Sequence, residues 1–177
     1  MNGITPIITE EERLVAELEL LDIHYLSRQT NYRAESLRPP ANLLASLVQQ
    51  PSARVRGALI AVLLAHPEFA DAMRAAMQHC SVTEQITLCY FYTAAMLLQQ
   101  MYASTIRQQL GAQWRWLPDL FSAELDLTQR STPRERLLLL GQLQQQRTHA
   151  FVNWAGTYQD VAQRLLRQWE LEKVWAP

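Results

Sequence analysis

Residues 81–111 read SVTEQITLCYFYTAAMLLQQMYASTIRQQLG, and this stretch predicts the centre of the fold. Ser81 and Glu84 have the Ser-x-x-Glu spacing of a capping box, which satisfies two backbone donors at a helix start. A long uncharged run follows, and Gly111 suits the left-handed position just past a helix end. A helix that is apolar on more than one face is normally buried on more than one face. We therefore predict a buried central helix over about 82–110.

The segments on either side of this stretch also carry helix signals. Thr9 with Glu12 and Thr132 with Glu135 repeat the capping-box spacing, and Pro133 stands at a first helical position. No segment alternates between apolar and polar residues as a strand does. The expected helices cover residues 9–28, 40–50, 53–65, 67–79, 82–110 and 133–150, with a last one starting at 157. The sequence thus predicts one all-α domain over residues 1–177, a bundle of about seven helices with more than about 60% helix.

Composition limits the classes of function. Of the 177 residues, 49% are apolar, which excludes disorder. The net charge is −1, so a nucleic-acid partner is not evident. The dense apolar part of the central run covers only residues 86–98, too few to span a membrane. The N-terminus lacks the basic and apolar regions of a signal peptide. We therefore expect a cytoplasmic protein without a membrane segment.

One stretch is similar to a known repeat. Residues 43–64 contain Leu-Leu-x-x-Leu, then Pro51, then Val55-Arg56-x-Ala58 and an aliphatic tail. This pattern resembles a HEAT repeat, in which two antiparallel helices are joined by a proline-containing turn, and the resemblance implies protein binding. No second copy follows at the period of about 40 residues that such arrays show. We expect a HEAT-like helical hairpin at 41–66 as a local feature.

Arg74 and His79 form the spacing Arg-x-x-x-x-His. The spacing resembles the signature of HEPN-type ribonucleases, small helical bundles that often pair across a dimer. That resemblance implies that Arg74 would hold phosphate and His79 would act as acid or base in RNA cleavage. The alternative is that both residues favour the negative end of a helix dipole.

The sequence shows no motif for a metal site or a phosphate-binding loop. No histidine has the Glu-x-x-His spacing of a di-iron bundle, and Cys80 and Cys89 have no second pair with which to bind zinc. Only five glycines occur, whereas phosphate-binding loops need them. We expect no cofactor and no metal.

The aromatic stretch after the central run is the candidate partner surface. Trp114, Arg115, Trp116 and Phe121 could stack on bases or bind a protein. Alternatively, they seal one end of the bundle.

The leading hypothesis is a non-enzymatic, cytoplasmic interaction or adaptor protein, because a full core occurs without a catalytic constellation. The alternatives are a HEPN-like ribonuclease or an inactive relative, and a regulatory module that binds a small apolar ligand in its core. We also expect a homodimer, since surplus apolar surface usually marks an interface. The last helix, whose stripe includes Tyr158, Leu165 and Trp169, is the expected contact, unless this stripe docks on its own domain.

Overall fold

A computed structural model describes residues 7–27, 32–127, 132–148 and 154–176 of the chain. Helices account for 72% of the residues and no strand occurs in these ranges, which confirms the predicted all-α fold. The α-helices are α1 (Glu10–Leu20), α2 (Pro40–Val48), α3 (Ala53–Ala65), α4 (Met73–Gln78), α5 (Val82–Met101), α6 (Ala103–Leu110), α7 (Pro133–Thr148) and α8 (Ala155–Trp175). Two short 3-10 helices, η1 (Pro67–Ala72) and η2 (Gly111–Gln113), complete the described elements.

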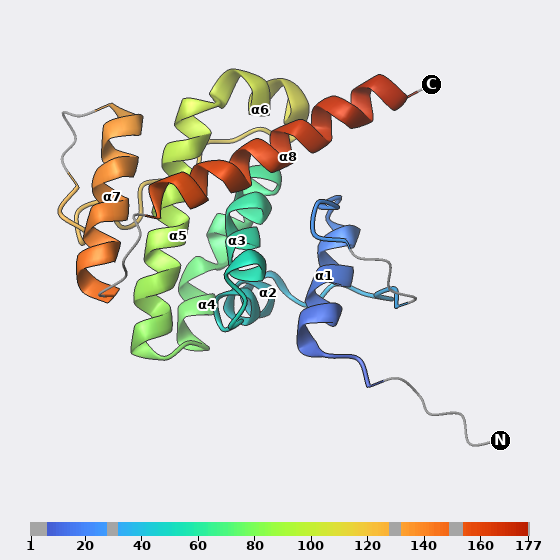
Figure 1. The fold of residues 1–177 in the computed structure, drawn as a ribbon, viewed down its shortest axis with the longest axis horizontal. Coiled ribbons are helices and arrows are strands. Elements are labelled where there is room, and N and C mark those ends of the chain that lie inside the picture. Colours follow the sequence, from blue (N-terminus) through green and yellow to red (C-terminus); the bar gives the residue numbers. More distant parts are fainter. Residues whose placement is uncertain (1–6, 28–31, 128–131, 149–153, 177) are drawn as a thin grey trace.

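The centre of the fold is the pair α3 and α5, which pack side by side (Figure 1). Phe91, Ala95 and Leu98 on α5 are all buried, so the predicted central helix is confirmed. Helix α3 is also central: every residue from Gly57 to Ala65 is buried. A helix without a polar face has to be covered on all sides. Helix α8 crosses both, α7 lies beyond α5, and α1 lies at the opposite side (Figure 1).

The long helix expected over about 82–110 is interrupted at Tyr102. This residue has φ −112° and ψ 23°, outside the helical region, which ends α5. Its N–H makes the last α-helical hydrogen bond, to Leu98 O at 2.9 Å. The chain then turns into α6, which packs on α3 and α8. The Tyr102 hydroxyl accepts a hydrogen bond from Gln159 of α8 at 3.1 Å. Since this contact comes from a distant part of the chain, the uncharged run alone does not reveal the break.

Helices α2 and α3 form the hairpin expected at 41–66, and α2 also packs against α4. The arginine early in α3 has a structural role in the turn. Arg56 Nη1 donates to the carbonyls of Gln50 at 2.9 Å and of Pro51 at 3.3 Å. These carbonyls follow the end of α2, where backbone acceptors lack partners within the helix.

The three predicted capping boxes are all present, at Thr9, Ser81 and Thr132. Helix α1 is shorter than expected, because it ends at Leu20 and Asp22 takes a left-handed φ of 58°. The segment that follows is buried rather than helical, with Ile23 fully inaccessible to solvent. Among the described helices, none has the length and apolarity needed to cross a bilayer.

Candidate functional site

Arg74 and His79 do not share any of the cavities found among the described residues. Both side chains are exposed, Arg74 on α4 and His79 at its C-terminal cap. His79 lines a surface hollow of about 430 Å³ with Arg38, Asn42 and Gln49, and Arg74 does not contribute to it. Five positions along a helix correspond to about 140° around its axis, so the two side chains diverge. The ribonuclease alternative stays a prediction, without a shared cleft to support it.

The aromatic stretch after α6 divides into a surface part and a buried part. The rings of Trp114 and Trp116 meet edge to face at 4.9 Å, and Trp116 remains 56% exposed. Arg115 between them forms a two-pronged ion pair with Asp71 at 2.6 and 3.1 Å. This pair lowers the pKa of the Asp71 carboxyl and occupies the guanidinium. Phe121 is buried, so it cannot belong to a partner surface.

Two polar side chains of α5, which the sequence analysis did not select, hold this stretch in place. Gln99 is fully buried, and its amide donates to Arg115 O at 2.9 Å and accepts from Leu117 N at 2.8 Å. The Tyr92 hydroxyl donates to Pro118 O at 2.8 Å. Gln99 follows the buried residues Tyr92 and Ala95 at helical spacing. This position on a buried face is the signal that could have identified the support, because buried amides need partners.

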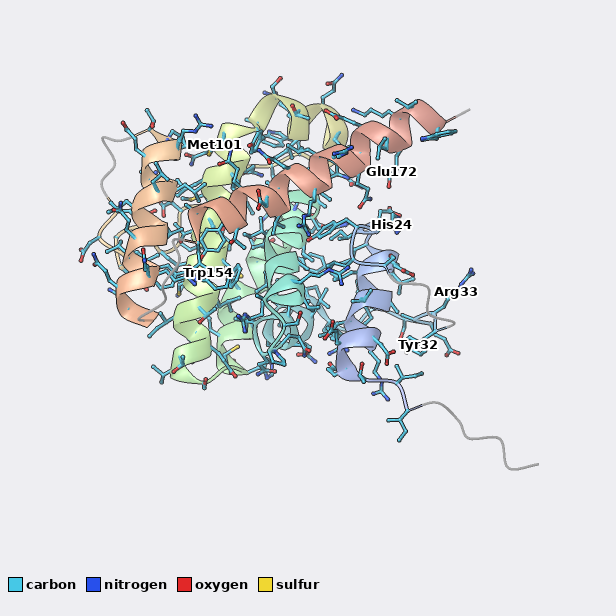
Figure 2. All side chains as sticks on the ribbon, viewed as in Figure 1. His24, Tyr32, Arg33, Met101, Trp154 and Glu172 are labelled. Carbon is cyan, nitrogen blue, oxygen red and sulfur yellow. The ribbon has the colours of Figure 1, made fainter. Side chains whose placement is uncertain are left out.

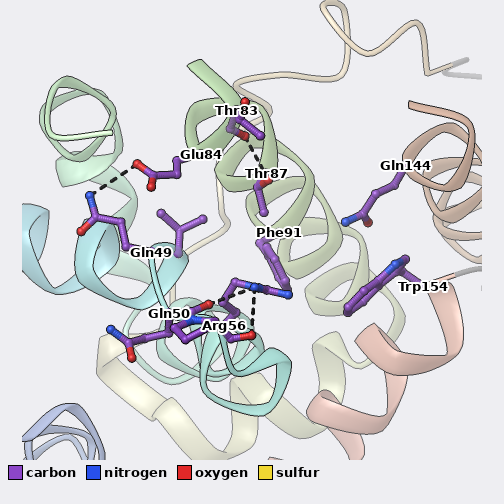
Figure 3. A pocket seen from close by; sticks show the side chains of 11 residues that line it. Gln49, Gln50, Arg56, Thr83, Glu84, Thr87, Phe91, Gln144 and Trp154 are labelled. Carbon is purple, nitrogen blue, oxygen red and sulfur yellow. Dashed lines mark hydrogen bonds between the residues drawn. The ribbon is translucent and has the colours of Figure 1, made fainter. Parts of the chain in front are cut away.

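A cavity of about 430 Å³ opens between the α2–α3 turn, α5, α7 and the start of α8 (Figure 3). Phe91 and Trp154 form its aromatic walls, and Gln144 reaches toward it from α7. Most of the other lining residues are polar: three amides, two threonines, Arg56 and Glu84. The small apolar ligand considered above stays a prediction.

Most of these polar groups already serve the fold. Arg56 donates to the two carbonyls beyond α2, and Glu84 Oε2 accepts from Ser81 N at 2.8 Å in the capping box of α5. The Thr87 hydroxyl donates to Thr83 O at 3.0 Å. These contacts explain the polar lining without a ligand. In the described residues no group of three or more His, Cys, Asp or Glu side chains is placed to hold a metal ion.

The segment after α1 is attached to α8 and α3 through its backbone. Gln168 of α8 donates to Asp22 O at 2.7 Å and accepts from His24 N at 2.9 Å. Arg54 of α3 donates to Leu26 O at 3.0 Å. Paired backbone contacts of this kind fix the position of a non-helical segment. They also place His24 and Tyr25 beside the C-terminal half of α8.

A groove of about 580 Å³ lies between this segment and α8. His24 and Glu172 lie on facing sides of it (Figure 2). We call it the α8 groove; its lining consists of His24, Tyr25, Arg164, Arg167, Gln168, Leu171, Glu172 and Trp175. Most of the exposed surface in the groove is apolar, and the apolar share is larger than in the cavity of Figure 3.

Charged groups stand along the α8 groove. Arg164 and Arg167 are exposed, and neither forms an ion pair with any residue that the structure describes. Glu172 Oε1 accepts from Gln168 Nε2 at 2.7 Å. Burial raises the pKa of Tyr25, an effect that the nearby Arg164 opposes. The groove therefore offers two unpaired guanidinium groups beside apolar surface.

The end of α8 is apolar and exposed. It projects beyond the body of the fold, with Leu171 51%, Val174 76% and Trp175 81% exposed (Figure 1). The stripe expected to form a dimer contact lies elsewhere on the same helix. Leu165 is inaccessible and Trp169 is only 5% exposed, because this stripe packs against α3 and α5. The predicted location of the contact was therefore wrong.

Comparison of the chain with protein-family models, with curated proteins and with solved structures finds no match. The HEAT-like and HEPN-like features thus remain local resemblances, and the α8 groove is the candidate functional site.

Proposed function

We propose that the protein is a non-enzymatic interaction protein that self-associates through the α8 groove. The observation that supports this proposal is the exposed apolar end of α8, where Leu171, Val174 and Trp175 stand beside an apolar hollow. Large apolar side chains gathered on one exposed patch usually mark an interface. Closed two-fold dimers are the commonest assemblies of soluble proteins.

Placement on the molecule adds to this support. The patch lies on the last two turns of a long helix whose first part is anchored in the core. Interfaces commonly depend on aromatic anchors, and Trp175 is the most exposed of the described tryptophans. A second copy supplies the same tryptophan, and burial of one such side chain covers about 150–250 Å².

A cytoplasmic location is part of the proposal. Cys80 and Cys89 are both free thiols, which fits a reducing compartment. Burial raises the pKa of the Cys89 thiol to about 11 and also raises that of Cys80. Neither thiol is therefore activated as a nucleophile, in agreement with a non-enzymatic role.

Sedimentation of the full chain at micromolar concentrations tests the proposal. We expect a dimer for the natural protein and a shift toward monomer for Trp175→Lys, which replaces the indole by a cation in a contact that already contains Arg164 and Arg167. Val82→Lys is the matched control, because Val82 is 74% exposed on a different helix. A natural protein that sediments as a monomer at all concentrations would refute self-association. RNA cleavage by the same preparation, abolished in His79→Ala, would favour the ribonuclease alternative instead.

A further inference from the structure

We propose that the cavity of Figure 3 binds a small aromatic carboxylate, with the carboxylate on Arg56 and the ring beside Phe91 and Trp154. This site goes beyond the proposed self-association and does not depend on it, since the cavity and the α8 groove share no lining residue. The volume of about 430 Å³ falls within the range of about 300–1,000 Å³ that is typical of small-molecule pockets.

Arg56 supplies the charge of this site. Its Nη1 donates to the carbonyls of Gln50 and Pro51, and these two contacts account for its position at the α2–α3 turn. A guanidinium has five N–H donors, so three remain on Nε and Nη2. Among the described residues these two atoms have no hydrogen-bond partner, and Arg56 forms no ion pair. The side chain is only partly exposed, so a charged group stands at the cavity with one edge unused.

Arg38 shows how this edge of a guanidinium binds a carboxylate in the same chain. Nε of Arg38 donates to Glu17 Oε2 at 3.0 Å and Nη2 donates to Glu17 Oε1 at 2.7 Å. Two parallel donors on one edge match the two oxygens of a carboxylate. In Arg56 the corresponding two atoms belong to a residue that lines a cavity. The same recognition therefore suits a carboxylate that a ligand brings.

The carboxylate of the lining is used elsewhere. Glu84 is directed toward Gln49 in Figure 3, and its Oε2 accepts from Gln49 Nε2 at 3.5 Å and from Ser81 N at 2.8 Å. No ion pair joins Glu84 to Arg56. The negative charge of Glu84 thus serves the start of α5, and the positive charge of Arg56 is left for an anion.

Aromatic rings provide the apolar part of the site. Phe91 is buried and forms the wall on α5, whereas Trp154 faces the cavity from the start of α8 and is partly exposed (Figure 3). The buried ring of Tyr158 contacts both, with its centroid 5.4 Å from that of Phe91 and 6.4 Å from that of Trp154. Aromatic rings favour aromatic neighbours in stacked or edge-to-face contact. A flat ring is therefore the apolar group that these walls suit.

Calorimetric titration of the full chain tests the ligand class. The probes are two aromatic acids, 4-hydroxybenzoate and indole-3-acetate, the neutral amide of each, and cyclohexanecarboxylate, which keeps the charge but has no aromatic ring. We expect one-to-one binding of at least one aromatic acid, about tenfold or more tighter than its amide and than cyclohexanecarboxylate. Failure of both acids to bind at about 10 mM, or equal affinity for acid and amide, would overturn the proposal.

Variants test the place of binding. Arg56→Met should abolish the preference for the acid over its amide, and this ratio is the measure because Arg56 also supports the α2–α3 turn. Arg56→Lys, which keeps the charge but lacks the two-pronged edge, should bind the acid more weakly than the natural protein. Arg74→Met is the control, since Arg74 is exposed and lies outside the cavity. An acid preference that survives Arg56→Met would overturn the assignment.

The aromatic wall has its own matched pair. Trp154→Ala should weaken the acid and the amide alike, by about tenfold, because both lose the same ring contact. Trp116→Ala removes an exposed tryptophan outside the cavity and should change neither. Equal effects of these two variants would contradict a ring beside Trp154. Trp175→Lys should bind the acid as the natural protein does, so a failure of self-association and a failure of this site remain distinguishable.

Discussion

Buried polar side chains differ in whether the fold gives them a partner. The Tyr92 hydroxyl donates to Pro118 O, whereas the Tyr158 hydroxyl is buried with no hydrogen-bond partner among the described residues. Both rings make edge-to-face contacts at 5.4 Å, Tyr92 with Phe121 and Tyr158 with Phe91. The two tyrosines thus provide similar ring packing with opposite hydrogen-bond states.

This contrast gives a prediction for two matched substitutions. Tyr92→Phe should lower the free energy of unfolding by about 1 kcal/mol, because a hydrogen bond is lost. Tyr158→Phe should leave it unchanged or raise it, since removing an unpartnered buried hydroxyl removes a desolvation cost. Urea unfolding of both variants beside the natural protein measures the difference. Equal losses in both would show that the Tyr158 hydroxyl has a partner after all.

At the scale of helices, their starts were predictable and their ends were less so. The capping boxes at Thr9, Ser81 and Thr132 depend on residues three positions apart, so the sequence contains all the information needed. The end of α5 at Tyr102 coincides with a contact to Gln159 of α8, which local sequence does not encode. For the same reason the buried role of Phe121 could not be separated from the exposed role of Trp116 beforehand.

The candidate site was harder to predict than the fold. The sequence predicted a contact on the regular apolar stripe of α8, but this stripe is the one that the core covers. The groove exists because Gln168 holds the backbone of Asp22 and His24 beside α8. More than a hundred residues separate these partners in the chain, so no local pattern connects them.

The close contact of α3 with α8 leads to a prediction about Gly57. A Cβ added at this position would lie 3.2 Å from Val161 Cγ2, which is tighter than an ordinary contact. Alanine favours a helix over glycine by about 1 kcal/mol, but here the gain is offset by crowding. We expect Gly57→Ala alone to change stability little. In a Val161→Ala background the same change should stabilise by about 1 kcal/mol.

Thermal unfolding of the two single variants and the double variant completes this cycle. The expected result is a coupling energy between the two sites, since neighbours in contact are not additive. Additive effects would mean that α3 and α8 adjust freely and that the glycine is not required for their approach.

For the whole molecule, the question is whether the N-terminal part unfolds together with the rest. Arg38 connects α1 with α2: it pairs with Glu10 at 2.6 Å and Glu17 at 2.7 Å on α1, and donates to Ser46 of α2 at 2.8 Å. Glu17 is only 7% exposed. The hydrogen bond with Glu17 is the largest of the effects that raise the pKa of Arg38, so this guanidinium stays charged.

Buried residues of α1, including Leu14 and Leu18, belong to the same core cluster as those of α3, α5 and α8. We therefore expect one cooperative unfolding transition.

Two probes can test this expectation. All five tryptophans lie at position 114 or later, so their fluorescence reports on the C-terminal part, whereas far-UV circular dichroism reports on every helix. Arg38→Ala leaves the Glu17 carboxylate without its partner and should cost on the order of 3 kcal/mol. Because the domain is single, both signals should shift to the same lower midpoint. Arg33→Ala, at an exposed position nearby, should shift neither. A fall in the circular dichroism midpoint with unchanged fluorescence would instead show that α1 and its connector unfold separately from the bundle.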